Sequence, residues 1–265
     1  MESGERRGGV AVITGASAGI GAASARGLAA QGMDVVLGAR RVDVTQALAD
    51  ELTAAHGVAT LAAPLDVTDR DSCAAFHQAA VDFAGDAGFA VFLNNAGLGR
   101  GVARIPEADE DDQVDWEEMI ETNVVGFLRV LRLFVADFVR QDRGLIVSMG
   151  SVAAIWPYEG GSVYCATKSS VRTITRSLRK ELGGTGVRVT TIHPGLVETE
   201  FSQVRFRGDE AKAASAYQGI TPLTGEDVAR SVVWLAGLPP HMNIEELSMM
   251  PVAQVSTTEV HRRPS

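Results

Sequence analysis

Short apolar runs alternate with longer amphipathic segments along most of the chain. The apolar runs are rich in β-branched residues and end in glycine or small polar residues, which is typical of buried strands. The pattern predicts strands at 9–14, 34–40, 59–67, 89–97, 144–151, 187–195 and 243–251. Helical periodicity predicts helices at 19–32, 42–57, 70–84, 115–140, 162–183 and 225–236.

This alternation predicts an α/β fold, a doubly wound parallel sheet of the Rossmann type with about seven strands and helices on both faces. The chain shows no internal repeat and no linker rich in Pro, Gly and Ser, so we expect a single domain over 1–265. Two segments lie outside the alternation. They are the acidic segment 98–114 and the segment 198–222.

The composition excludes several classes of protein. Hydrophobic residues make up 46% of the 265 residues, which is enough for a sizeable core. A net charge of −9 argues against a nucleic-acid or anionic-membrane surface. No apolar run is long enough for a membrane span, and residues 1–9 lack the apolar stretch of a secretory signal. Cys73 and Cys165 show neither paired nor metal-like spacing, so we expect a reduced, cytoplasmic protein without a metal.

A glycine-rich loop joins the first expected strand to the first expected helix. In TGASAGIG (14–21), Gly15, Gly19 and Gly21 permit backbone conformations and close approaches that a Cβ would block. The loop delivers a helix N-terminus whose free N–H groups and dipole suit a pyrophosphate. An ordinary glycine turn is the alternative, but the flanking strand and helix favour a dinucleotide site.

Two arginines follow the second strand, where dinucleotide sites distinguish their cofactors. NAD-binding sites usually place an acidic residue there for the ribose 2′-hydroxyl, whereas an arginine accommodates a 2′-phosphate. Here Arg40 and Arg41 occupy the region, and no carboxylate follows before Asp43. Two solvated charges are the alternative, yet cations are unfavourable at a helix N-terminus. The sequence therefore predicts NADP(H) as the cofactor.

Polar residues also end the later strands. Asp66 either caps the following helix or receives the adenine amino group of the cofactor. The run NNAG (94–97) is either a plain turn or part of the crevice in which open α/β sheets bind ligands. His193 ends the sixth strand and has no second metal ligand near it in sequence.

The main catalytic candidate is a tyrosine followed four residues later by a lysine. Tyr164 and Lys168 share one face of the expected helix 162–183, and Ser151 follows the fifth strand at the same sheet edge. Tyrosine is a poor base at neutral pH, and a nearby ammonium lowers its pKa. The chain has three lysines and otherwise uses arginine, so a lysine here suggests a role that a guanidinium cannot fill. An isolated pair with this spacing could also be a helix-surface pair.

Taken in order, these segments resemble the short-chain dehydrogenase/reductase family. The matching motifs within residues 9–200 are TGASAGIG, LDV (65–67), NNAG, TNVVG (122–126), GS (150–151), YCATK (164–168) and PGLVET (194–199). Each motif is weak alone, but seven in order are specific. The family implies hydride transfer to or from a nicotinamide. It also implies a homotetramer in which the C-terminal segment 252–265 reaches a neighbouring subunit.

The resemblance implies a role for each catalytic candidate. Tyr164 would be the general acid in ketone reduction and the general base in alcohol oxidation. Ser151 would bind the substrate oxygen, and Lys168 would bind the nicotinamide ribose and lower the pKa of Tyr164. Asn123, in a distorted part of the long helix, would hold a water in a proton relay. Cofactor contacts are expected from Gly15, Ser17, Ala18, Gly19, Ile20, Gly21, Arg40, Arg41, Asp66, Val67, Asn95, Ala96, Gly97, Tyr164, Lys168, Pro194, Gly195, Val197 and Thr199.

The C-terminal half resembles a narrower group, the NADP-dependent 3-hydroxy acid dehydrogenases, which include serine and allo-threonine dehydrogenases. The resembling segments are 150–172, 199–218 and 238–254. Segment 198–222 would then be a lid, in which Arg205 or Arg207 clamps a substrate carboxylate. Both arginines could equally be solvated on a mobile loop. Arg100 and Arg104 are lesser candidates.

Three functions compete. The first is an NADP(H)-dependent oxidoreductase of small 3-hydroxy or 3-oxo acids, similar to serine or 3-hydroxyisobutyrate. The second is an NADPH-dependent reductase of carrier-bound 3-oxoacyl groups or of a secondary-metabolite ketone, although an acidic carrier needs a basic docking patch that this sequence does not show. The third is a dinucleotide-sensing module without turnover, which the intact tyrosine and lysine disfavour. We therefore expect the first.

Overall fold

The computed structural model describes residues 9–263, and within that range seven strands form one sheet in which every neighbouring pair is parallel. This arrangement confirms the predicted fold class, and its first six positions follow the order known from dinucleotide-binding folds. In spatial order the strands are β3 (Thr60–Pro64), β2 (Asp34–Ala39), β1 (Val10–Thr14), β4 (Phe89–Asn94), β5 (Gly144–Met149), β6 (Val187–Pro194) and β9 (Glu246–Met249).

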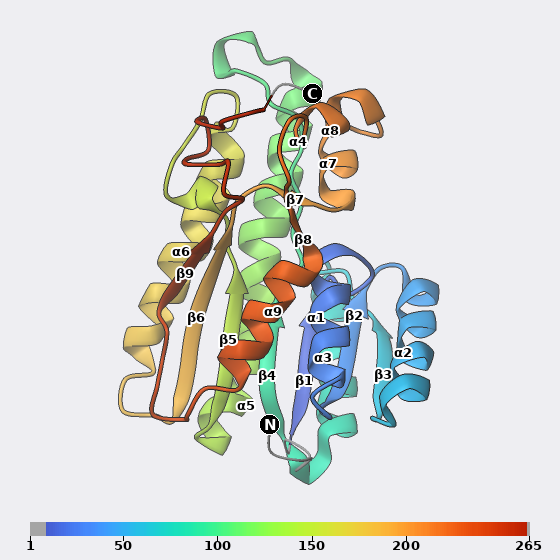
Figure 1. The fold of residues 1–265 in the computed structure, drawn as a ribbon. Helices are drawn as coiled ribbons and strands as arrows, with labels where there is room; N and C mark the ends of the chain where they lie inside the picture. Colours follow the sequence, from blue (N-terminus) through green and yellow to red (C-terminus); the bar gives the residue numbers. More distant parts are fainter. Residues whose placement is uncertain (1–8, 264–265) are drawn as a thin grey trace.

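Helices cover both faces of this sheet (Figure 1). One face packs against α1 (Gly19–Ala29), α2 (Val42–His56) and α9 (Gly225–Ala236). The other face packs against α3 (Arg70–Ala84), α5 (Phe127–Gln141) and α6 (Ser162–Glu181). Because both faces are covered, the strands are continuous apolar runs rather than alternating ones. In β1, for example, Val10 and Val12 join one core, and Ala11 and Ile13 join the other.

The long helix expected at 115–140 is divided into three parts. They are α4 (Glu110–Ile120), a π-helical segment η3 (Glu121–Gly126) and α5. The helix begins earlier than predicted because the Asp109 side chain accepts a hydrogen bond from the Asp112 amide in a capping box. π-Helical turns occur mostly as single interruptions at functional sites, and this one contains Asn123.

The predicted lid contains regular structure that the sequence did not indicate. It begins with β7 (Val197–Glu198), which pairs with β8 (Leu223–Thr224), and between these strands lie α7 (Glu200–Arg205) and α8 (Glu210–Ser215). Figure 1 shows α7 and α8 beyond the end of the sheet toward which β1 runs. The remaining short helical turns are η1 (Gly85–Ala87), η2 (Ile105–Glu107) and η4 (Val152–Ala154). Among residues 9–263, no helix has the length and apolar character that crossing a membrane requires.

The cap of α3 is Asp69, so the interpretation of Asp66 as the capping residue is wrong. The Asp69 carboxylate accepts hydrogen bonds from the amides of Asp71 (2.7 Å) and Ser72 (3.1 Å). The Asp66 carboxylate instead accepts from the Thr68 amide at 2.9 Å and the Thr68 hydroxyl at 2.7 Å. Asp66 therefore remains at the edge of the sheet, where a ligand can reach it.

Candidate active site

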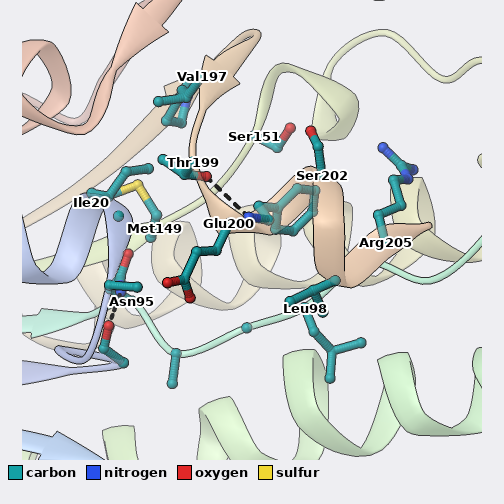
Figure 2. Close-up of a pocket in the computed structure, with 18 of the residues that line it drawn as sticks. Ile20, Asn95, Leu98, Met149, Ser151, Val197, Thr199, Glu200, Ser202 and Arg205 are labelled. Atoms are coloured by element: carbon teal, nitrogen blue, oxygen red, sulfur yellow. Dashed lines mark hydrogen bonds between the residues drawn. The ribbon is translucent and has the colours of Figure 1, made fainter. Parts of the chain in front are cut away.

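The carboxyl ends of the strands open into one cavity of about 680 Å³, which lies within the size range of small-molecule sites. In the view of Figure 2, Ile20 and Asn95 lie on one side of it, and Ser151 and Arg205 lie on the other. Of the expected cofactor contacts, Gly21 alone does not line the cavity. Those that do are Gly15, Ser17, Ala18, Gly19, Ile20, Arg40, Arg41, Asp66, Val67, Asn95, Ala96, Gly97, Tyr164, Lys168, Pro194, Gly195, Val197 and Thr199.

Gly21 has a packing role beneath the loop. A Cβ at this position would lie 2.2 Å from the Gly15 carbonyl oxygen and 2.9 Å from Nδ2 of Asn95. The Asn95 amide in turn donates to the carbonyl oxygens of Thr14 (3.0 Å) and Gly15 (3.3 Å). The glycine spacing therefore lets α1 approach β1 and β4 closely enough to bring its N-terminus to the cavity.

The donor groups at this end of the cavity fit a phosphorylated dinucleotide. α1 begins at Gly19, and its N-cap residue Ala18 provides no side-chain hydrogen bond, so the first N–H groups stay available for an anion. Arg40 and Arg41 line the same end and are exposed. A helix N-terminus suits a pyrophosphate, and a guanidinium suits a ribose 2′-phosphate.

Tyr164 lies at the opposite end, on the first turn of α6, and is buried. Burial raises the pKa of Tyr164 to about 12, and the Arg205 guanidinium and a hydrogen bond with Ser151 act in the opposite direction. The Arg205 guanidinium carbon lies 4.9 Å from the centre of the tyrosine ring, whereas Nζ of Lys168 lies at 6.0 Å. The sequence predicted that Lys168 lowers the pKa of Tyr164. In this structure the Arg205 guanidinium lies nearer to the ring, and it opposes the increase in pKa that burial causes. Cys165, beside Tyr164, is a buried thiol whose pKa burial raises, as an inert thiol requires.

Lys168 is also buried, with 6% of its surface exposed. Its Nζ donates to the Met149 carbonyl oxygen at 3.0 Å, and burial lowers the pKa of Lys168 from 10.5 to about 8. The ammonium thus has one hydrogen-bond acceptor in a site that disfavours its charge. Among residues 9–263, two of its three donors remain without a partner and can bind ligand hydroxyls at the cavity surface.

Ser151 is held at the end of β5 by an arrangement that sequence reasoning missed. His193 is fully buried at the end of β6, and its Nδ1 lies 3.1 Å from the Ser151 carbonyl oxygen. Burial lowers the pKa of His193, so the neutral ring can donate this hydrogen bond. Gly150 makes room for the ring, because a Cβ there would lie 2.6 Å from Nδ1. No feature of the sequence shows that a strand-end histidine packs against this loop.

Asn123 does not line the cavity. Its side-chain amide donates to the Leu98 carbonyl oxygen at 2.8 Å, and its Oδ1 accepts from the Leu98 amide at 2.9 Å. A further donated bond reaches Oγ1 of Thr167 on α6 at 3.2 Å. The side chain therefore joins the loop after β4 to α6, and Gly97 of that loop lies beside Lys168.

The two lid arginines predicted to meet substrate lie in different environments. Arg205 lines the cavity, donates to the Tyr158 hydroxyl, and donates from Nε to the Gly101 carbonyl oxygen at 3.3 Å. Arg207 does not line the cavity, and its guanidinium, which is 60% exposed, pairs with Asp115 at 2.6 Å. The structure thus brings Arg205, and not Arg207, to Tyr164.

Arg100 and Arg104, the lesser candidates for binding a substrate carboxylate, form ion pairs with glutamates. Arg100 forms two hydrogen bonds with Glu118, at 2.8 and 3.0 Å. Arg104 pairs with Glu107 at 3.0 Å and with Glu159 at 2.8 Å. Neither arginine lines the cavity.

The buried Lys168 makes stability depend on pH in a defined window. Below about pH 8 both the folded and unfolded states carry the charge; between 8 and 10.5 only the unfolded state does, so the folded state gains stability as pH rises. A shift from 10.5 to about 8 corresponds to about 3 kcal/mol. As pH rises from about 8 to 10.5, the free energy of unfolding of Lys168→Met should therefore fall by about 3 kcal/mol relative to that of the native chain.

Chemical denaturation without cofactor at pH 7.5, 8.5, 9.5 and 10.5 measures this difference. Lys180→Met, which removes an exposed lysine from the same helix, is the control and should follow the native chain at every pH. A difference between Lys168→Met and the native chain that stays constant with pH would show that Lys168 is not held in an environment that disfavours its charge.

Comparison with known proteins places the chain in a family. Residues 9–210 match the family model of short chain dehydrogenases. The chain is 43% identical over 256 residues to an NADP-dependent 3-hydroxy acid dehydrogenase of Salmonella typhi, covering 96% of this chain and 99% of that protein. It is 39% identical over 247 residues to the serine 3-dehydrogenase of Agrobacterium fabrum, covering 93% of this chain and 95% of that protein.

A solved structure agrees with these sequence matches. The closed form of a serine dehydrogenase complexed with NADP⁺ superposes with a TM-score of 0.86 and is 40% identical, covering 96% of this chain and all of that one. The chain therefore belongs to the short-chain dehydrogenase family, and it is an oxidoreductase that acts on CH–OH groups.

Proposed function

We propose that this protein is an NADP(H)-dependent dehydrogenase of small 3-hydroxy acids. One observation carries the proposal: Ser151, Tyr164 and Lys168 line the same cavity as the glycine loop and the Arg40–Arg41 pair. A single extended ligand can therefore reach both the phosphate-binding end and the tyrosine. The names of the relatives, which include NADP-dependent 3-hydroxy acid and serine dehydrogenases, support both the cofactor and the substrate class.

The chain's own residues would move the proton, and the nicotinamide, when bound, supplies or accepts the hydride. With a pKa of about 12, Tyr164 is protonated at neutral pH and can donate its phenolic proton to the oxygen of a 3-oxo substrate. The Ser151 hydroxyl would hydrogen-bond the same oxygen as charge develops on it. In the oxidative direction Tyr164 must lose its proton, and the nearby Arg205 guanidinium favours that phenolate.

Lys168 would hold the nicotinamide ribose through its free N–H donors. This role explains why a buried ammonium is kept at a position where burial lowers its pKa. Asn123 would act indirectly, by holding the Leu98 backbone and hence the loop beside Lys168. Both N–H donors of the Asn123 side chain are used by Leu98 and Thr167, so a relay water there would have to donate to Oδ1 or bind other groups.

Arg205 would clamp the substrate carboxylate. It is the predicted lid arginine that lines the cavity, and its guanidinium lies against the Tyr164 ring, near the position that a reacting carbonyl must take. A 3-hydroxy acid places its carboxylate two bonds from the reacting carbon, so one cation near the tyrosine can bind it. Bidentate pairing with a carboxylate suits the guanidinium fork.

The family resemblance also implies a homotetramer, and we propose that assembly here. Leu128 and Val139 of α5 are large apolar side chains left exposed, which is consistent with burial against another subunit. Cys73 and Cys165 are both buried and free, which suits the reducing cytoplasm that we propose as the location.

Cofactor choice tests the assignment of Arg40 and Arg41. The double variant Arg40→Ala, Arg41→Ala should lower kcat/KM for NADP⁺ by roughly 10- to 100-fold, because it removes charge-assisted hydrogen bonds to the 2′-phosphate. The value for NAD⁺ should change little. Arg179→Ala, on α6, is the matched control. A native enzyme that prefers NAD⁺, or a variant with an unchanged preference, would contradict the assignment.

Substrate choice tests the role of Arg205. Absorbance of the reduced nicotinamide should show turnover of NADP⁺ with at least one of L-serine, D-serine, allo-threonine and 3-hydroxyisobutyrate. Arg205→Leu should lower kcat/KM for that acid by roughly 30- to 1000-fold, because a buried carboxylate loses its partner. Reduction of an uncharged ketone by NADPH should change far less. Arg207→Leu should stay within about twofold for both substrates, because its guanidinium is 60% exposed and does not line the cavity.

The same assay separates the competing functions. If every acid fails but NADPH reduces simple ketones, the substrate class is wrong and the ketoreductase alternative gains support. If neither acids nor ketones turn over while NADPH still binds, the dinucleotide-sensing alternative stands.

A further inference from the structure

Arg41, which we assign to the 2′-phosphate, already has an anionic partner in the lid. Its Nη2 lies 2.8 Å from Oε2 of Glu200 and 3.1 Å from the Ser17 hydroxyl oxygen. Glu200 is the first residue of α7, and its carboxylate lines the same cavity. The pair therefore joins the end of β2 to a lid residue 159 positions later in the chain.

The position of Glu200 matters because of its charge. Acidic side chains beside a dinucleotide ribose usually favour the unphosphorylated cofactor, and a carboxylate near a 2′-phosphate repels it. Arg40, the neighbouring cation, forms no ion pair within the described residues, so Glu200 engages one arginine and leaves the other free. Figure 2 shows Glu200 projecting from the start of the lid between Thr199 and the Asn95 side of the cavity.

We propose that Glu200 occupies Arg41 only while the 2′-phosphate site is empty, and that the 2′-phosphate displaces it when the phosphorylated cofactor binds. The inference rests on the proposed function, because it takes Arg41 as a 2′-phosphate ligand. A phosphate carries more charge than a carboxylate and three strong acceptor oxygens, so it outcompetes Glu200 for the guanidinium. Glu200 is half exposed and can turn away into solvent.

The lid has separate attachments at its two ends. At the far end, Arg207 pairs with Asp115, and the Gly101 amide donates to the Arg205 carbonyl oxygen at 2.9 Å. At the near end, the Glu200–Arg41 pair connects the first turn of α7 to the cofactor edge. The near end is also held by the pairing of β7 with β8, by the hydrogen bond between the Ser202 and Tyr217 hydroxyls, and by the bond that Tyr217 donates to the Val197 carbonyl oxygen. Displacement of Glu200 therefore leaves the lid attached, and the competition acts on the affinity for the phosphorylated cofactor alone.

Binding of cofactor fragments tests this proposal without turnover. Calorimetry at low ionic strength would measure the affinities of 2′,5′-ADP and 5′-AMP for the native chain, for Glu200→Gln and for Glu198→Gln. Glu198→Gln is the control, because Glu198 is an exposed acid two residues earlier. Glu200→Gln should bind 2′,5′-ADP about 5-fold more tightly, the upper range for removal of an exposed ion pair. It should leave 5′-AMP unchanged, and Glu198→Gln should change neither. An unchanged or weakened affinity of Glu200→Gln for 2′,5′-ADP would overturn the proposal.

Arg41→Gln separates this inference from the proposed function. If Arg41→Gln still prefers 2′,5′-ADP over 5′-AMP as strongly as the native chain does, then Arg41 is not a 2′-phosphate ligand, and both the assignment and the inference fail. If Arg41→Gln loses the preference but Glu200→Gln behaves like the native chain, the assignment stands and the competition alone is refuted.

Discussion

Parallel pairing of the strands is the constraint on which the site depends. Because all seven strands run the same way, the loop after β1, the arginines after β2, and the serine after β5 arrive at one edge. Such a sheet needs helices on both faces, and α6 crosses back so that its first turn brings Tyr164 to that edge. Residues spread over most of the chain therefore line a single cavity as a direct consequence of the sheet topology.

Burial is the second feature, and it sets the chemistry. It raises the pKa of Tyr164 and lowers that of Lys168, so both groups resist charging before cofactor binds. A site of this kind favours ligands that bring compensating polar groups, such as ribose hydroxyls. Arg205 lies close to the tyrosine ring, and because it belongs to the lid, its effect on Tyr164 depends on the position of the lid. If Arg205 clamps the substrate carboxylate as proposed, one side chain links substrate binding to proton transfer.

The sequence predicted the elements whose physics is local, and it missed those fixed by tertiary contacts. The bounds of α3 and α9 agree with the prediction, because glycine and polar residues mark their ends. α7 and α8 were missed because six-residue helices carry too little periodicity to detect. The choice of Asp69 over Asp66 as a cap depends on where the chain turns. The packing of His193 against Ser151 and the pairing of Glu200 with Arg41 join residues that no local pattern connects.

The central claim is that Tyr164 transfers the proton in a cavity that binds the nicotinamide cofactor independently of that step. Tyr164→Phe removes the phenolic oxygen and keeps the ring. The decisive measurement is the single-turnover rate at which a 3-oxo acid or a simple ketone oxidises NADPH bound to this variant, with the NADPH affinity measured by fluorescence. The account predicts affinity within about twofold of the native chain and a rate at least about 100-fold lower, the lower range for general acid catalysis. Undiminished oxidation of NADPH in the variant would contradict it.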